Sequence, residues 1–201
     1  MGEVKIKICG LTRPEDVCWV NESEADYAGF VLFYPNSRRN ITAEKAKGLL
    51  SLLSESIRSV AVVVSPTIGQ VSEIESVGFD MIQVHGKVDE AFLSQIHLPV
   101  FRAININEGN ICLEEHSKVT GYVFDGKEPG SGKTFDWSRL SKIGRKNKLL
   151  MLAGGLNCEN VLEGIERVKP DIVDVSSGVE TNYLKDRSKI MAFVKTVRKG
   201  R

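Results

Sequence analysis

The sequence predicts a single (β/α)8 barrel, or TIM barrel, that spans residues 1–201. Apolar runs rich in β-branched residues alternate with amphipathic segments from one end of the chain to the other. There are eight such pairs of about 25 residues each, which suits a compact barrel. No proline-rich or glycine/serine-rich linker interrupts them, which favours one domain. A doubly wound open sheet has the same local pattern but usually needs fewer strands or a second domain, so the barrel is favoured.

Each element follows from its own pattern. The apolar runs have the length and composition of buried strands, and they cover residues 4–9, 27–32, 58–64, 81–85, 99–104, 121–125, 149–153 and 171–176. The segments between them have helical periodicity, and they cover residues 14–23, 42–54, 67–77, 88–96, 107–117, 137–145, 158–168 and 185–198. Thr12 and Glu15 have the spacing of a capping box around Pro14, and Ser65 is a candidate N-cap.

Composition excludes several classes of protein. With 27 basic and 26 acidic residues, the charge is balanced, so nothing indicates a nucleic acid or an anionic membrane as partner. Apolar runs are strand-sized and no leader pattern precedes the first one, so we expect no membrane association and a cytoplasmic location. The four cysteines (Cys9, Cys18, Cys112 and Cys158) are scattered without paired spacing or a nearby histidine. We therefore expect neither disulfides nor a bound metal.

Chemistry in such barrels lies in the loops that follow the strands. The first predicted strand ends in Cys9 and the sixth in Asp125, and this thiol and carboxyl form a potential acid–base pair. The fourth strand ends in His85, which is a candidate base or a hydrogen-bonded wall residue. Asp174, in the eighth strand, is expected either to contact a sugar hydroxyl or to hold the polar interior of the barrel, with neither role favoured.

Glycine and serine follow the seventh and eighth strands, at Gly154-Gly155 and at Ser177-Gly178. Glycine lets the backbone approach an anion, and amide groups at a helix start favour negative charge. Barrels often bind phosphate at these two loops, so we predict a phosphate site there. Residues 130–134 resemble a nucleotide-binding P-loop but lack its first glycine, because that position is Lys127. We expect a flexible lid instead.

Taken in order, the motifs resemble those of the phosphoribosylanthranilate isomerase family. The resemblance covers nearly the whole chain. It rests on Lys7-Ile8-Cys9-Gly10-Leu11-Thr12, Gly29-Phe30-Val31 with residues 33–39, Gln83-Val84-His85-Gly86, residues 130–137, Ala153-Gly154-Gly155-Leu156-Asn157 and residues 174–180. Val84 and Cys158 depart from the usual leucine and proline of that family, at positions where packing tolerates the change.

The resemblance implies a cofactor-free, metal-free barrel that converts N-(5′-phosphoribosyl)anthranilate into 1-(2-carboxyphenylamino)-1-deoxyribulose 5-phosphate in tryptophan biosynthesis. By resemblance, Cys9 is the general base, Asp125 the general acid, and Arg39 the ligand of the anthranilate carboxylate. Arg38 is an alternative for that last role. The expected partner is thus a phosphosugar–anthranilate substrate, and His85 borders its pocket.

Two other functions stay open. One is another phosphosugar-binding barrel enzyme, although such lyases and epimerases typically use a strand-end lysine or a metal, neither of which stands out here. The other is a non-catalytic sensor of a phosphate ligand, which would need the glycine-rich loops but not Cys9 together with Asp125. The sequence leaves monomer and homodimer open, as well as acceptance of the related aminoimidazole substrate of histidine biosynthesis.

Overall fold

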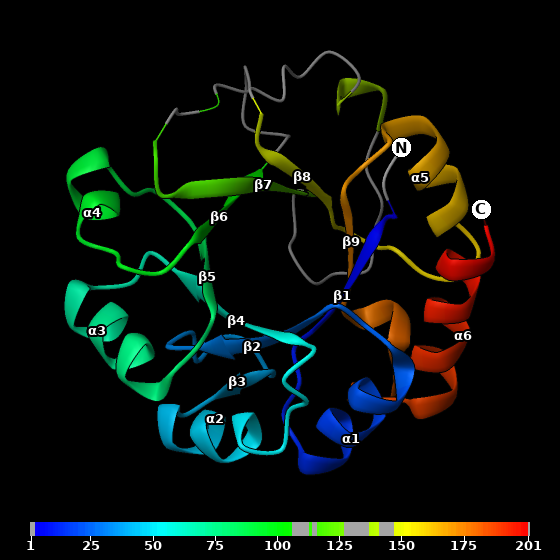
Figure 1. Cartoon of the computed structure of the whole chain (residues 1–201), viewed down its shortest axis with the longest axis horizontal. Coiled ribbons are helices and arrows are strands. Elements are labelled where there is room, and N and C mark those ends of the chain that lie inside the picture. Colours follow the sequence, from blue (N-terminus) through cyan, green and yellow to red (C-terminus); the bar gives the residue numbers. More distant parts are fainter. Residues whose placement is uncertain (1–2, 106–112, 114–115, 127–136, 141–146, 201) are drawn as a thin grey trace.

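The predicted barrel is confirmed. The computed structural model describes residues 3–105, 113, 116–126, 137–140 and 147–200. A closed ring of parallel strands lies inside a layer of helices (Figure 1). Ring closure follows from the first strand, which pairs in parallel with both the second and the last strand of the barrel.

All eight predicted strands are present, with ends that move by at most two residues. They are β1 (Lys5–Cys9), β2 (Tyr27–Leu32), β4 (Arg58–Val64), β5 (Met81–His85), β6 (Val100–Asn105), β7 (Val119–Asp125), β8 (Leu149–Leu152) and β9 (Ile172–Val175). A short β3 (Asn40–Ile41) pairs with the end of β2, and β10 (Glu180–Thr181) forms a hairpin with β11 (Leu184–Lys185). These three additions all lie beyond the carboxyl ends of barrel strands.

The described helices surround the ring, and each follows a strand (Figure 1). They are α1 (Pro14–Ser23), α2 (Ala43–Leu50), α3 (Ile68–Val77), α4 (Glu90–Ser94), α5 (Val161–Val168) and α6 (Arg187–Lys199), with 3-10 turns η1 (Trp137–Leu140) and η2 (Ser177–Val179). Three expected segments lie outside the described residues: most of the helix over 107–117, the lid over 130–134, and residues 141–145 of the helix over 137–145. Among the described helices, none is long and apolar enough to span a membrane.

Two predicted helix starts need correction. The acid that caps α1 is Asp16 rather than Glu15: its buried carboxylate accepts hydrogen bonds from the backbone N–H groups of Thr12 (2.9 Å) and Arg13 (3.1 Å). Helix α3 is capped by Thr67 rather than Ser65. Ser65 has a φ of 43°, outside the extended conformation that an N-cap residue adopts.

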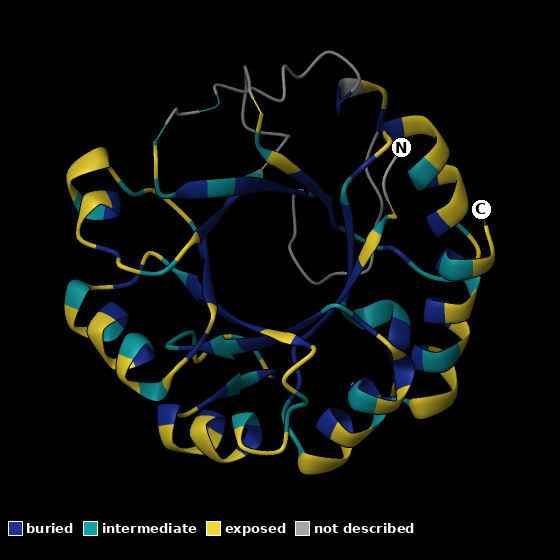
Figure 2. Cartoon of the chain, in the orientation of Figure 1, coloured by how far each residue is buried: buried dark blue, intermediate teal, exposed yellow. Residues whose placement is uncertain are grey.

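Side chains alternate along each strand and divide the apolar residues into two groups. One group fills the space between strands and helices and includes Ile6, Ile8 and Phe30. The other lies inside the ring and includes Cys9, Phe101 and Met151. Figure 2 shows the buried strands within a layer of helices whose outer faces are exposed. On β1, Lys7 and Cys9 are therefore on the face that points to the interior.

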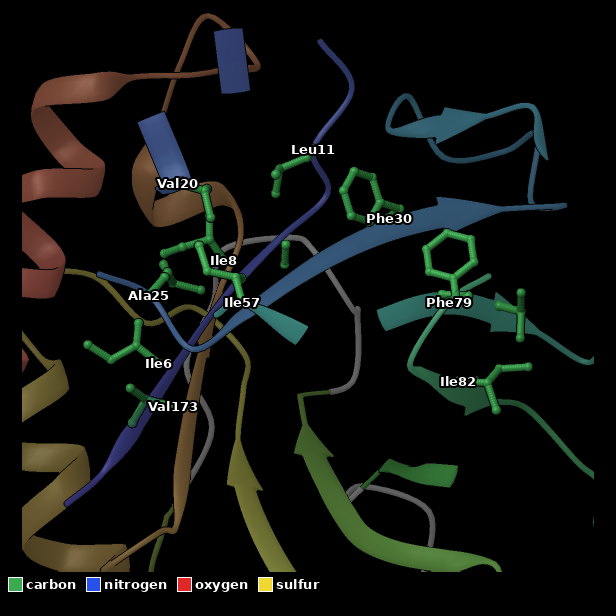
Figure 3. Close-up of a cluster of buried hydrophobic side chains, with 14 of the residues drawn as sticks. Ile6, Ile8, Leu11, Val20, Ala25, Phe30, Ile57, Phe79, Ile82 and Val173 are labelled. Atoms are coloured by element: carbon green, nitrogen blue, oxygen red, sulfur yellow. The ribbon is translucent and has the colours of Figure 1, made fainter. Parts of the chain in front are cut away.

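Aromatic packing connects β2 to the outer layer. The rings of Phe30 and Phe79 pack edge to face with their centroids 5.9 Å apart, and both side chains are buried (Figure 3). Ile82, on β5, belongs to the same core. Phe30 and Gly29 are neighbours on β2, so they lie on opposite faces of the strand. Phe30 packs in the outer core, and Gly29 faces the interior of the barrel.

We expect Phe30→Ala to lower the free energy of unfolding by about 3–5 kcal/mol, because it leaves a cavity against Phe79. Urea denaturation measures this loss, and Phe30→Leu is the milder variant should the alanine chain fail to fold. The leucine variant should lose less stability, because it leaves a smaller cavity. A loss below about 1 kcal/mol for Phe30→Ala would show that the outer core closes around the gap.

Candidate active site

Cys9 is the last residue of β1 and lies at the rim of the barrel, with 8% of its surface exposed. Its backbone oxygen accepts a hydrogen bond from Oγ of Ser176 (2.9 Å), which joins the end of β1 to the loop after β9. Gly29 pairs with Cys9 in the sheet, and a Cβ at that position would lie 2.8 Å from the sulfur. The thiol therefore occupies space that only glycine leaves free. Burial raises the pKa of Cys9, and the nearby charge of Lys7 opposes that shift.

Lys7 and Asp174 form a buried ion pair beneath this thiol. Nζ of Lys7 donates to both carboxylate oxygens of Asp174 (3.1 and 3.0 Å), and the two residues are paired in the sheet. Lys7 has no exposed surface. Burial by itself lowers the pKa of Lys7, but the charges of Asp174 and Cys9 outweigh it, so the pKa is raised and the side chain is a cation.

Asp125 ends β7 and is half-buried at the same end of the barrel. Its Oδ1 accepts a hydrogen bond from the N–H of Gly126 (2.7 Å). Burial raises the pKa of Asp125 to about 6, and the negative charge of Asp174 adds to this shift while Gly126 and Lys7 oppose it. The carboxyl is thus able to carry a proton near neutral pH.

His85 ends β5 and is uncharged. Burial lowers its pKa to about 4, assisted by the positive charges of Lys7 and Arg102. The amide of Gln83 and Nε2 of His85 form a hydrogen bond of 2.8 Å. The guanidinium of Arg102 donates to the backbone oxygens of Val84 (2.9 Å) and Ala103 (3.1 Å). Of these contacts, the one to Gln83 holds the His85 ring itself, which is compatible with a wall residue.

Arg39 lies across the end of β1, where Gly10 has a φ of 82° and leaves room for its aliphatic stem. Its Nε and Nη2 donate to the two carboxylate oxygens of Glu180 (2.7 and 2.9 Å). Lys185 donates to the same carboxylate (2.7 Å) and to the backbone oxygen of Ser176 (3.0 Å). This buried cluster connects the loop after β2 to the β10–β11 hairpin.

Arg38, the alternative to Arg39, points elsewhere. It is exposed, and its guanidinium lies over the ring of Tyr183 at 3.7 Å from the centroid. The two neighbouring arginines thus differ in environment, since Arg39 is buried beside Cys9 and Arg38 stacks on the outer surface of the hairpin.

The two glycine-rich loops contact each other. Gly154 and Gly155 have φ values of 82° and 68°, which are readily adopted only by glycine. A Cβ at Gly178 would collide with the backbone of Leu156, so the turn after β9 packs closely on the loop after β8. Within the described part of the chain, no hydrogen bond uses the amide groups of Gly155, Ser177 or Gly178.

The structure brings the sequence-predicted residues to one end of the barrel, and it adds partners that the sequence did not indicate. Lys7, Glu180 and Lys185 are the additions. The alternation of β1 did place Lys7 on the face of Cys9, but nothing in the sequence paired it with Asp174. Among the described residues, no three His, Cys, Asp or Glu side chains are grouped as metal ligands would be.

Ionisation of Asp125 opposes folding, because its pKa in the folded chain is raised from 3.8 to about 6. The penalty is absent below the lower value and complete above the higher one. Asp125→Asn removes the charge and keeps an oxygen for the N–H of Gly126. We expect its free energy of unfolding to exceed that of the parent by on the order of 1–3 kcal/mol at about pH 8, and by nothing at about pH 3.5. Urea denaturation at both pH values tests this; equal stability at the higher pH would contradict it.

Comparison with known proteins identifies the family. The family model described as "N-(5'phosphoribosyl)anthranilate (PRA) isomerase" matches residues 6–196. The chain is 42% identical over 196 residues to the N-(5'-phosphoribosyl)anthranilate isomerase of Streptococcus mutans, covering 97% of this chain and 99% of that protein.

Solved structures agree with this result. Phosphoribosyl anthranilate isomerase from Thermus thermophilus superposes with a TM-score of 0.88 at 28% identity, over 98% of this chain and 100% of that one. A phosphoribosyl anthranilate isomerase in complex with reduced 1-(o-carboxyphenylamino)-1-deoxyribulose 5-phosphate gives a TM-score of 0.81 at 32% identity, over 97% and 98% of the two chains. The chain belongs to the N-(5′-phosphoribosyl)anthranilate isomerase family.

Proposed function

We propose that this member of the family isomerises N-(5′-phosphoribosyl)anthranilate with Cys9 as general base and Asp125 as general acid. The observation that carries these roles is the placement of a thiol and a carboxyl at the carboxyl ends of β1 and β7, around the Lys7–Asp174 pair. Both groups respond to the charges of that pair, so they share one interior. The family and the fold are consistent with this reaction.

Asp125 suits the first step, in which the ribose ring opens. The C1–O bond breaks while a proton reaches the ring oxygen, and the nitrogen lone pair forms a Schiff base with C1. A carboxyl with a pKa of about 6 is partly protonated near neutral pH and can donate this proton.

Cys9 suits the second step, in which the C2 proton is removed. The electron pair of the C2–H bond moves toward the iminium at C1, and the product is an enolamine that tautomerises to the ketone. The thiolate is the basic form of cysteine, so the cationic side chains around Cys9 favour the active state.

The substrate phosphate is proposed to bind at Gly154, Gly155, Ser177 and Gly178. The support is the close packing of the two loops and the amide groups there that make no hydrogen bond within the described part of the chain. Such amides favour an anion. At the opposite end of the substrate, the anthranilate carboxylate is assigned to Arg39.

The contacts that Arg39 already makes limit how it can bind the anthranilate carboxylate. Its Nε and Nη2 already donate hydrogen bonds to Glu180, whereas Nη1 has no partner among the described residues. We therefore assign a single charge-assisted contact from Nη1 rather than the bidentate pair that an arginine often forms with a carboxylate. Glu180 fixes the orientation of the guanidinium.

The remaining expectations from the sequence stay predictions. We expect the reaction to need neither a cofactor nor a metal, since proton transfers alone complete it. Asp174 is assigned to the interior ion pair first, because both of its oxygens accept from Lys7, and contact with the ribose is a second role. We also expect the protein to be cytoplasmic and to be either a monomer or a homodimer.

Cys9→Ala and Asp125→Asn should each lower kcat by about 10²–10⁴, the usual contribution of general acid–base catalysis. The measurement is the loss of fluorescence of freshly formed phosphoribosylanthranilate, with circular dichroism to confirm folding. Affinity for the reduced product analogue should change little in Cys9→Ala. Full activity of Cys9→Ala would remove the base assignment, and full activity of Asp125→Asn would direct attention to His85.

Arg39→Ala should raise KM by a factor that corresponds to about 1–3 kcal/mol, with a smaller effect on kcat, because a charge-assisted contact is lost. Arg38→Ala is the matched control, since it removes the same charge from the neighbouring exposed position and should leave KM unchanged. A raised KM in Arg38→Ala alone would assign the carboxylate to Arg38.

A further inference from the structure

Lys7 is buried in the barrel, and the two proton transfers assigned to Cys9 and Asp125 do not by themselves account for it. Its ammonium and the carboxylate of Asp174 are both desolvated, with relative exposures of 0% and 8%. Removing two charges from water costs several kcal/mol per ion, and apolar residues in their place are often neutral or stabilising. A buried pair of this kind is therefore weak evidence for a purely structural role.

The position of Lys7 points to Cys9. The two residues lie two apart on β1, so their side chains share the interior face of the strand. A Cβ at Gly29 would lie 2.8 Å from Sγ of Cys9 and 3.1 Å from Nζ of Lys7. The thiol and the ammonium thus converge on the one space that glycine leaves empty in β2.

Asp174 fixes the ammonium in that position. It holds Nζ through both of its oxygens and comes from β9, the neighbour of β1 on the side opposite to β2. The ammonium of Lys7 therefore lies between β2, at Gly29, and β9, where Asp174 binds it. A flexible four-carbon side chain gains in this way the fixed direction that an electrostatic role requires.

We propose that Lys7 is a positioning residue whose ammonium, oriented by Asp174 and admitted by Gly29, is the counter-cation of the Cys9 thiolate. The inference rests on the proposed role of Cys9 as base. Lys7 stays protonated throughout: the C2 proton passes to the sulfur, and the ammonium stabilises the thiolate before the transfer.

Four charged groups face Cys9 from the elements packed around it. Lys7 comes from β1, Asp174 from β9, Lys185 from β11 and Arg39 from the loop before β3. Burial raises the pKa of the thiol, Lys7 is the strongest opposing charge, Asp174 adds to the rise, and Lys185 opposes it less than Lys7. Loss of the whole Lys7–Asp174 pair should therefore raise the pKa of Cys9.

The test replaces the pair as a unit, with Lys7→Met and Asp174→Val in one chain. This variant leaves no unpaired buried charge, so it should fold even if the single Lys7→Met chain does not. Cysteine labelled with ¹³C at Cβ reports the thiol titration by NMR, and Cys9→Ser assigns the signal. Lys185→Met is the matched control, since it removes another buried lysine, which is paired with Glu180.

We expect the double variant to hold at least about tenfold less Cys9 thiolate than the parent at a given pH, an upward shift of about one pKa unit. Lys185→Met should shift the titration less. An unshifted midpoint in the double variant, or an equal shift in Lys185→Met, would overturn the role of Lys7.

The titration uses no substrate, which separates this inference from the proposed mechanism. An unshifted midpoint together with an inactive Cys9→Ala variant overturns the role of Lys7 alone. A fully active Cys9→Ala variant overturns the base assignment, and with it the catalytic purpose of Lys7, whatever the titration shows. Wild-type kcat in the double variant would likewise overturn the inference.

Discussion

The ion pair between Lys7 and Asp174 is the interaction around which the polar end of the barrel is arranged. It crosses from β1 to β9, the junction that closes the ring. Both of its charges act on Cys9 and Asp125, and the Lys7 charge also acts on His85; these three residues come from three different strands. A closed parallel barrel brings the ends of distant strands to one rim, and the pair gives those ends a common electrostatic environment.

A second buried cluster fixes the outer boundary of the site. Arg39 and Lys185 share the carboxylate of Glu180, so the loop after β2 and the hairpin after β9 are connected above Cys9. Lys189 of α6 also donates to the backbone oxygen of Glu180 (2.7 Å). An arginine with two of its nitrogens already bound is oriented before any ligand arrives, which lowers the entropy lost on binding.

The sequence allowed the barrel to be predicted because each strand carries its own signal of length, β-branching and spacing. Cys9 and Asp125 could be named because strand ends are readable from those patterns. Contacts between distant strands have no such signal: nothing in the sequence pairs Lys7 with Asp174, or Arg39 with Glu180. The starts predicted for α1 and α3 were wrong by one or two residues, because side chains able to cap stand close together in the sequence: Asp16 follows Glu15, and Thr67 lies two residues after Ser65.

Burial raises the pKa values of both proposed catalytic groups, which helps the acid and hinders the base. It raises the pKa of Asp125 to about 6, which suits an acid that must carry a proton. It also raises the pKa of Cys9, which hinders a base that must lose one. Near neutral pH the reactive combination of thiolate and protonated carboxyl is therefore a minor form of the enzyme. A cation beside Cys9 increases that population without restoring water to the site, and this is the physical reason we infer for a buried lysine at position 7.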